Sequence, residues 1–231
     1  MNLEDEHMRK VIVGAMVSLD GVMQAPGGPQ EDPTGGFHHG GWVAPLADEV
    51  FGEEMGKLFE HPFDLLLGRK TYEIFAAHWP HAENGPDDAI ARTFNSITKY
   101  VATRKGLELT WQGSVALGDA ASDVARLKQG DGPTLLTQGS TELIHTLLAG
   151  DLVDEIHTFT FPVVLGNGKK LFDDGGKAAA FKLTGSRVSP NGIVIARYER
   201  EGSVKTGDFA MEPPSAAEVA RREKMQREAQ E

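Results

Sequence analysis

The chain has 231 residues, 40% of them hydrophobic, which is enough for one large domain with a proper core. It contains no cysteine, which excludes disulfides, thiolate metal sites and cysteine nucleophiles. The formal net charge of -11 argues against nucleic acid or an anionic membrane as partner, because both are bound mainly through lysine and arginine.

Three segments are expected along the chain. Residues 1–8 are expected to be a flexible extension, residues 9–200 to form one domain, and residues 201–231 to form a charged tail that is partly helical or disordered. No apolar stretch approaches the roughly 18 to 20 residues that span a bilayer, and the acidic start does not resemble a signal peptide. We therefore expect a cytoplasmic protein that does not bind membranes.

The apolar run 11–17 predicts a central strand, buried on both faces. Residues 20–41 are too rich in glycine and proline for a regular element, and a loop of this length is usually functional. Apolar residues then recur at helical spacing and predict a first helix with Pro45 in its first turn. They are Leu46, Val50, Phe51, Met55, Leu58 and Phe59.

Short apolar runs then alternate with helical segments, which predicts βαβ units on a largely parallel sheet. The predicted strands are 64–67, 99–103 and 134–137, and the predicted helices are 71–77, 120–129 and 141–149. Strand-like segments 155–165, 181–188 and 193–198 follow without long helices, and Asn191-Gly192 signals a hairpin. The expected fold class is α/β: a mixed, mainly parallel sheet flanked by helices and ending in an antiparallel hairpin.

The carboxyl ends of parallel strands collect ligands, because the helices that follow present free N–H groups there. After the strand at 64–67, Gly68 permits close approach, Arg69 can grip a phosphate and Thr71 can cap the helix. An ordinary capped helix with a surface arginine explains this segment equally well when it is considered alone.

Two further strand ends carry similar residues. Thr103 and Arg104 suit the ribose 2′-phosphate of NADPH, with a solvated basic turn as the alternative. At the end of the next strand, Gly139 lets the backbone approach a pyrophosphate, while Ser140 and Thr141 offer hydrogen-bond donors. Three such turns on successive strands predict a dinucleotide site.

Several other activities lack their motifs. Gly166-Asn167-Gly168 lacks the third glycine of the Rossmann fingerprint, and Gln138-Gly139-Ser140-Thr141 does not match the serine-hydrolase nucleophile elbow. The histidines between His38 and His157 match no metal-ligand spacing, so we expect no metal site.

Taken in chain order, these residues resemble the dihydrofolate reductase-like family, in the form of the RibD C-terminal (riboflavin-biosynthesis reductase) domain and its stand-alone bacterial members. The resemblance covers roughly residues 8 to 200. Its motifs are Ser18-Leu19-Asp20-Gly21, Gly40-Gly41-Trp42, Leu67-Gly68-Arg69-Lys70-Thr71-Tyr72-Glu73, Trp79-Pro80, Gly139-Ser140 with Leu143, Leu152-Val153-Asp154-Glu155, and Pro162-Val163-Val164-Leu165-Gly166-Asn167-Gly168.

The resemblance implies NADPH as cofactor and a homodimer. The residues that it and the strand ends assign to the cofactor are Gly21, Gly68, Arg69, Thr71, Thr103, Arg104, Gln138, Gly139, Ser140, Thr141 and Leu143. True dihydrofolate reductases keep a carboxylate a few residues beyond a tryptophan. Here Asp48 and Glu49 follow Trp42 at a different spacing, so they are the catalytic candidates, while folate itself is a doubtful substrate.

The sequence thus predicts an NADPH-dependent reductase that transfers a hydride to a C=N or C=O bond of a small polar substrate, such as a pterin-like compound or a pyrimidine. The alternative is a non-catalytic dimeric module that senses NADPH, since no convincing acid or base appears outside the cofactor turns. A riboflavin-pathway reductase proper needs a site for a ribose phosphate, for which Lys169 and Lys170 are available.

Overall fold

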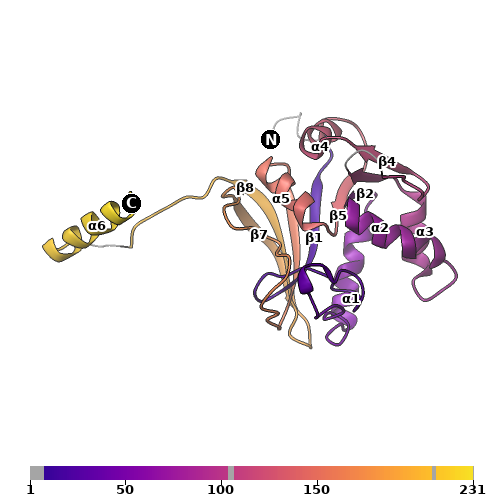
Figure 1. The fold of residues 1–231 in the computed structure, drawn as a ribbon, viewed down its shortest axis with the longest axis horizontal. Helices are drawn as coiled ribbons and strands as arrows, with labels where there is room; N and C mark the ends of the chain where they lie inside the picture. The colour runs from indigo at the N-terminus through magenta and orange to yellow at the C-terminus, as the bar shows by residue number, and fades with distance from the viewer. Residues whose placement is uncertain (1–7, 104–106, 210–211, 231) are drawn as a thin grey trace.

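The computed structural model describes residues 8–103, 107–209 and 212–230. Within them, eight strands form one sheet in the order β4-β3-β2-β5-β1-β6-β8-β7 (Figure 1). The strands are β1 (Val11–Ser18), β2 (Phe63–Gly68), β3 (Lys99–Ala102), β4 (Ser114–Leu117), β5 (Thr134–Thr137), β6 (Glu155–Phe161), β7 (Ala180–Val188) and β8 (Val194–Gly202). The α-helices are α1 (Glu49–Gly56), α2 (Arg69–His78), α3 (Asp88–Ser96), α4 (Ala120–Lys128), α5 (Thr141–Ala149) and α6 (Ala216–Glu228).

The sheet is parallel from β4 to β6 and becomes antiparallel at β8. β7 and β8 form the final hairpin, whose turn contains Gly192 at φ 81°. The positive φ is what the Asn-Gly signal requires, because glycine adopts it without a steric penalty. The predicted fold class, a mainly parallel mixed sheet with an antiparallel end, is confirmed.

Helices cover both faces of the sheet. On one face, Phe51 of α1, Tyr72 of α2 and Phe94 of α3 pack against strand residues such as Leu65 and Phe159. On the other face, the helices α4 and α5 bury a second apolar cluster against the strands. Its members include Val11, Val13, Leu66, Leu135, Val124, Ile144 and Leu147. Because both faces of β1 are buried, its unbroken apolar sequence is explained.

The first helix begins later than its apolar pattern predicts. Asp48 has an extended backbone, at φ -134° and ψ 177°, and its side chain accepts a hydrogen bond from the amide of Phe51. This is an N-cap, so α1 starts at Glu49 and the predicted start at Pro45 is wrong. Leu46 still packs against the core, from the turn before the helix.

Two described elements have no counterpart in the sequence prediction. Helix α3 carries the apolar residues Ile90 and Phe94 at helical spacing, and they pack on the core together with the buried Ala91 and with Ile97, which follows the helix. The spacing was therefore a usable signal. Strand β4 is a short edge strand with a mostly exposed surface, which leaves little hydrophobic pattern in its sequence.

The C-terminal segment leaves the body after β8 and ends in α6, away from the sheet (Figure 1). Glu218 pairs with Arg222 at 2.8 Å and with Arg221 at 2.6 Å, both across one helical turn. No described residue of α6 is buried. Among the described residues, no helix is both long enough and apolar enough to cross a bilayer.

Candidate functional site

The turns that follow β2 and β5 lie side by side, because these two strands pair in the sheet. The hydroxyl oxygens of Thr71 and Ser140 are 3.0 Å apart, and the Thr137 hydroxyl donates to the carbonyl of Gly139 at 2.9 Å. A Cβ atom on Gly68 would lie 2.2 Å from the hydroxyl oxygen of Ser140. Glycine is therefore required at position 68 for the two turns to meet.

A cavity of about 1500 Å³ opens at this edge of the sheet. Ligand pockets typically measure about 300 to 1,000 Å³, so this cavity has room for a dinucleotide and a second small molecule together. From the turn after β2, it is lined by Gly68, Arg69 and Thr71. It is lined by Thr103, which follows β3, and by residues of the turn after β5 and the start of α5: Gln138, Gly139, Ser140, Thr141 and Leu143. The structure thus brings nine of the predicted cofactor residues to one cavity.

Two predicted cofactor residues are not among these nine. Arg104 lies outside the described residues. Gly21 does not line the cavity; at φ 82° it forms a tight turn whose carbonyl accepts from the amide of Leu171 at 2.9 Å. Its neighbour Asp20 accepts from the hydroxyl of Ser18 and from the amide of Leu165, and these bonds lower the pKa of Asp20 to about 2. The Ser-Leu-Asp-Gly motif therefore ties the loop after β1 to the loop after β6.

The two catalytic candidates also lie outside the cavity lining. Although partial desolvation opposes it, hydrogen bonds from the amides of Phe51 and Asn191 lower the pKa of the Asp48 carboxyl. Asp48 caps α1 and connects it to the β7–β8 hairpin. Glu49 is exposed in the first turn of α1, where a negative charge is favourable.

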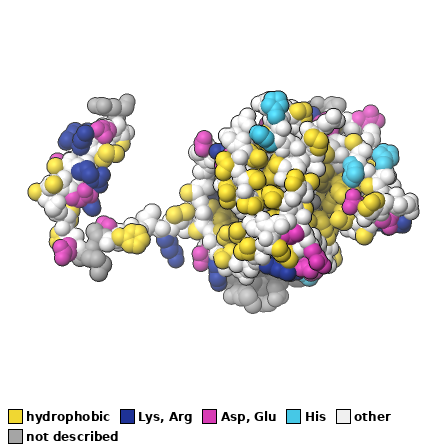
Figure 2. All heavy atoms as spheres, turned by 90° about the horizontal axis from the view of Figure 1, so that it is seen from below, with side chains coloured by type: hydrophobic (Ala, Val, Ile, Leu, Met, Phe, Trp, Pro, Cys, Tyr) yellow, Lys and Arg dark blue, Asp and Glu magenta, His cyan; other side chains and the backbone are white. Residues whose placement is uncertain are grey.

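One wall of the cavity is apolar, and its residues are not among the site residues predicted from the sequence. It is formed by side chains from β1, from α1, α2 and α3, and from the short segments that follow α1 and α2. Figure 2 shows apolar side chains gathered around a hollow on the face seen from below. The wall includes Met16, Phe51, Met55, Phe59, Trp79 and Phe94. From the sequence, these positions are predicted to be buried in the core. Residues that line an apolar cavity follow the same periodicity as core residues, so the pattern does not distinguish the two.

A third wall comes from the glycine- and proline-rich loop, at residues 23–32. The loop is ordered by the buried side chain of Gln24, which donates to the carbonyls of Asp32 and Thr34, both at 2.9 Å. Its oxygen accepts from the amide of Lys169 at 3.0 Å. Glu31 also lines the cavity, and burial raises the pKa of its carboxyl. The expectation that this long loop is functional fits its place at the cavity.

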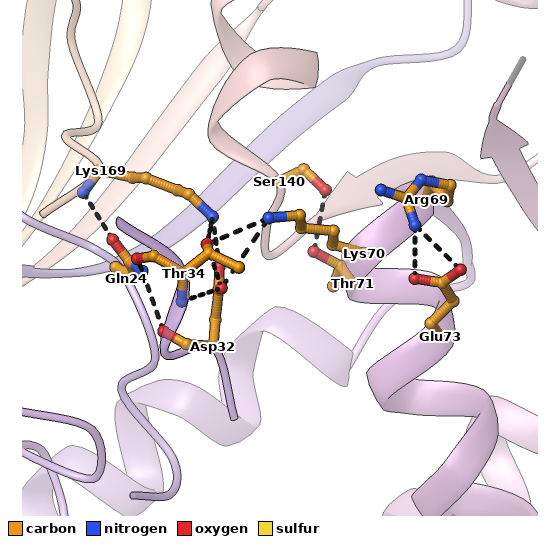
Figure 3. A network of polar contacts seen from close by, with 9 residues as sticks. All are labelled: Gln24, Asp32, Thr34, Arg69, Lys70, Thr71, Glu73, Ser140 and Lys169. Atoms are coloured by element: carbon orange, nitrogen blue, oxygen red, sulfur yellow. Dashed lines mark hydrogen bonds and ion pairs between the residues drawn. The ribbon is translucent and has the colours of Figure 1, made fainter. Parts of the chain in front are cut away.

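Three cations stand at the rim of the cavity (Figure 3). Arg69 contacts both carboxylate oxygens of Glu73, at 3.0 and 2.9 Å, and about half of each side chain is exposed. Lys70 and Lys169 both reach the hydroxyl of Thr34, at 3.1 and 3.0 Å. The three cations supply donors that an anionic ligand can use, and they share the cavity with the carboxylates of Glu31, Asp32, Glu73 and Glu142.

The residues present fit a dinucleotide. Gly68 and Gly139 leave backbone space beside Thr71 and Ser140, where a Cβ atom on either glycine would fill the cradle. Arg69 supplies the forked donors that suit a phosphate. Among the described residues, no group of three or more His, Cys, Asp or Glu side chains is placed to hold a metal ion.

The chain is similar to known proteins in sequence and in fold. It is 27% identical to YyaP of Bacillus subtilis (strain 168) over 196 residues, which cover 84% of this chain and 96% of the relative. A solved Shewanella sp. PV-4 protein named for riboflavin biosynthesis superposes with a TM-score of 0.56 at 21% identity, covering 83% of this chain and 99% of that one.

A more distant solved structure has the same fold. The dihydrofolate reductase of Enterococcus faecalis, complexed with NADP(H), superposes with a TM-score of 0.52 at 12% identity, covering 83% of this chain and 96% of that one. The family profile of the RibD C-terminal domain matches residues 9–195, which include strands β1 to β7 and the start of β8. The chain therefore belongs to the RibD C-terminal domain family.

Proposed function

We propose that this chain is an NADPH-dependent reductase that acts on a C=N or C=O bond of a small heterocyclic substrate. The observation that carries the proposal is a single cavity with two kinds of wall. The turns at Gly68–Thr71 and Gln138–Thr141 form a polar cradle, and the same cavity continues along an apolar wall. A dinucleotide needs the first surface for its phosphates, and a hydride acceptor needs the second to exclude water.

The polar cradle would hold the cofactor. Arg69 and the turn at Gly139-Ser140 would bind its phosphates, and Thr103 with Arg104 would select the 2′-phosphate that distinguishes NADPH from NADH. When bound, NADPH supplies the hydride. The chain's own part is to fix the distance and angle between cofactor and substrate.

The apolar wall favours a flat substrate whose faces contact Met16, Met55 and Phe51, with its polar groups along the edge. This fits a pterin-like or pyrimidine ring. For the proton that must accompany the hydride, we propose Glu31. It lines the cavity and burial raises the pKa of its carboxyl, which favours the protonated form of a donor, whereas Asp48 is held as a helix cap.

The homodimer that the family resemblance implies remains a proposal. β7 ends the sheet, and Leu183, Val188 and Val194 on the β7–β8 hairpin are 52%, 64% and 45% exposed. Pairing with a second copy would cover this apolar edge. Light scattering on the purified chain gives its mass in solution and decides between one copy and two.

The reductase proposal is tested by following NADPH oxidation with a panel of pterin, ribitylaminopyrimidine and imine substrates. Steady, enzyme-dependent oxidation with any of them is the expected result, and Arg69→Ala should raise the NADPH dissociation constant about tenfold. Tight NADPH binding with no turnover across the panel would contradict the proposal and favour a non-catalytic sensing module.

A further inference from the structure

Two ammonium groups from distant parts of the chain meet at the rim of the cavity (Figure 3). Lys70 is the second residue of α2, and Lys169 lies in the loop between β6 and β7. Both donate to the hydroxyl of Thr34, and both pair with the carboxylate of Asp32. Lys169 contacts this carboxylate directly, while the Lys70 nitrogen is 3.9 Å away.

The charges of this group do not balance. One carboxylate serves two ammonium groups, and the adjacent Arg69 is already paired with Glu73. Direct contact with Lys169, then partial burial and the charge of Lys169, lower the pKa of Lys70, as expected for two cations held close together. Two like charges held together carry an energetic cost, and a group with more than one negative charge would offset it better than a single carboxylate.

The position of the group allows a ligand to reach it. Lys70, Lys169 and Asp32 all line the cavity, next to the turn where Thr71 meets Ser140. The two lysine side chains are 42% and 34% exposed, so they are accessible from the cavity without unfolding of the loop. Asp32 itself belongs to the loop that Gln24 holds in place.

We infer that Lys70 and Lys169 form a binding site for a phosphate or diphosphate group, and that Asp32 competes with this group for the two ammonium ions. The negative side chain is thus an internal competitor built into the loop. The site explains why two lysines and one aspartate converge from three separate segments. It deepens the proposed function, but its test does not require hydride transfer.

The test uses inorganic pyrophosphate as the probe and isothermal titration calorimetry of the full chain at low salt. Asp32→Asn keeps the shape of the side chain and removes the competitor, so pyrophosphate should bind about tenfold more tightly. Lys169→Gln should weaken binding by about tenfold for the same reason. Equal affinities in wild type and both variants would overturn the inference.

Lys177 and Asp151 provide a matched pair of controls. They form an exposed ion pair with 3.6 Å between the Lys177 nitrogen and the Asp151 carboxylate, and neither residue lines the cavity. Lys177→Gln and Asp151→Asn change the net charge of the chain by the same amounts. Their effects on pyrophosphate binding should be small because exposed charges at a distance are screened. If Asp151→Asn tightens binding as much as Asp32→Asn, the effect is one of overall charge, and the proposed competition is contradicted.

Urea unfolding of each variant shows whether it retains the fold, and a variant that does not is replaced by Asp32→Ser or Lys169→Met. Two sources of the phosphate are separated by repeating the titration with saturating NADPH. Competition assigns the site to the diphosphate of the dinucleotide, and simultaneous binding assigns it to a phosphate on the substrate. If the variants behave as expected and no substrate is reduced, the anion site stands while the reductase proposal fails.

Discussion

The two ends of the parallel sheet use the same charged residue types in opposite ways. At the amino end, Arg9 and Asp64 pair at 2.5 Å with their side chains 4% and 11% exposed. Arg9 also donates to the carbonyl of Pro133 at 2.6 Å, and Asp64 accepts from the amide of Thr98 at 3.2 Å. The charges at this end are buried, paired and hydrogen-bonded within the chain.

At the carboxyl end, Arg69 and Lys70 are 51% and 42% exposed and lie at the rim of the cavity. Their partners, Glu73 and Asp32, compensate them only in part, because Asp32 is shared with Lys169. A charged residue with a structural role is therefore buried and fully paired, whereas a charged residue that faces a ligand is exposed and incompletely paired.

The largest effect is expected from Asp64→Ala. It leaves the Arg9 guanidinium buried without its carboxylate, which costs about 3 to 5 kcal/mol of unfolding free energy. The matched change at the other end, Glu73→Ala, breaks an exposed pair and should cost less than about 1 kcal/mol. Urea unfolding measures both, and equal losses would remove the contrast between the two ends.

Gly68→Ala is expected to weaken NADPH binding at least tenfold and to destabilise the fold by about 1 to 3 kcal/mol. Gly68 has φ -78° and ψ 162°, which alanine adopts readily, so the cause would be the clash with Ser140 alone. Gly52→Ala in α1 is the control: its Cβ meets nothing within 4 Å, and it should stabilise the helix by up to about 1 kcal/mol. Unchanged NADPH affinity in Gly68→Ala would show that the cradle tolerates a side chain.

Glu155 gives the amino end a measurable acid sensitivity. Hydrogen bonds from His157 and Lys10 lower the pKa of Glu155 to about 2, from an ordinary 4.5. A carboxyl with a lowered pKa stabilises the fold above pH 4.5, and this stability is lost as the pH falls from 4.5 towards 2. Between pH 7 and pH 3, wild type should lose about 1 kcal/mol more unfolding free energy than Glu155→Gln. Identical pH profiles in urea unfolding would refute this assignment.

The smallest effect on turnover is expected from Asp48→Ala. Loss of the cap should cost about 1 kcal/mol of unfolding free energy and leave NADPH oxidation nearly unchanged. Glu31→Gln, in contrast, should slow oxidation and abolish the alkaline limb of its pH–rate profile. The reverse pattern would restore Asp48 as the proton donor.

The sequence predicted what local patterns determine. The helix predicted at 141–149 matches α5 (Thr141–Ala149), and the glycines at 68 and 139 predicted a polar strand edge because a turn motif is contained in a few consecutive residues. The antiparallel end was signalled by Asn191-Gly192 in the same way.

The parts that could not be predicted depend on contacts between distant residues. Lys70, Lys169 and Asp32 are separated by long stretches of sequence, and only the three-dimensional path of the loop brings them together. Asp48 has a side chain that could serve as a catalytic acid. Its role as a helix cap depends on where α1 begins, which the sequence did not predict. The apolar wall could not be predicted because its residues have the same hydrophobic pattern as core residues.

The most direct test of the central claim is calorimetric titration of the purified chain with NADPH and, separately, with NADH. The account predicts micromolar binding of NADPH with a clear preference over NADH, because Arg69, Lys70 and Lys169 offer donors to phosphate and Thr103 lies on the cavity lining. Absence of binding to both would contradict the account and leave the strand-end turns with a structural role only.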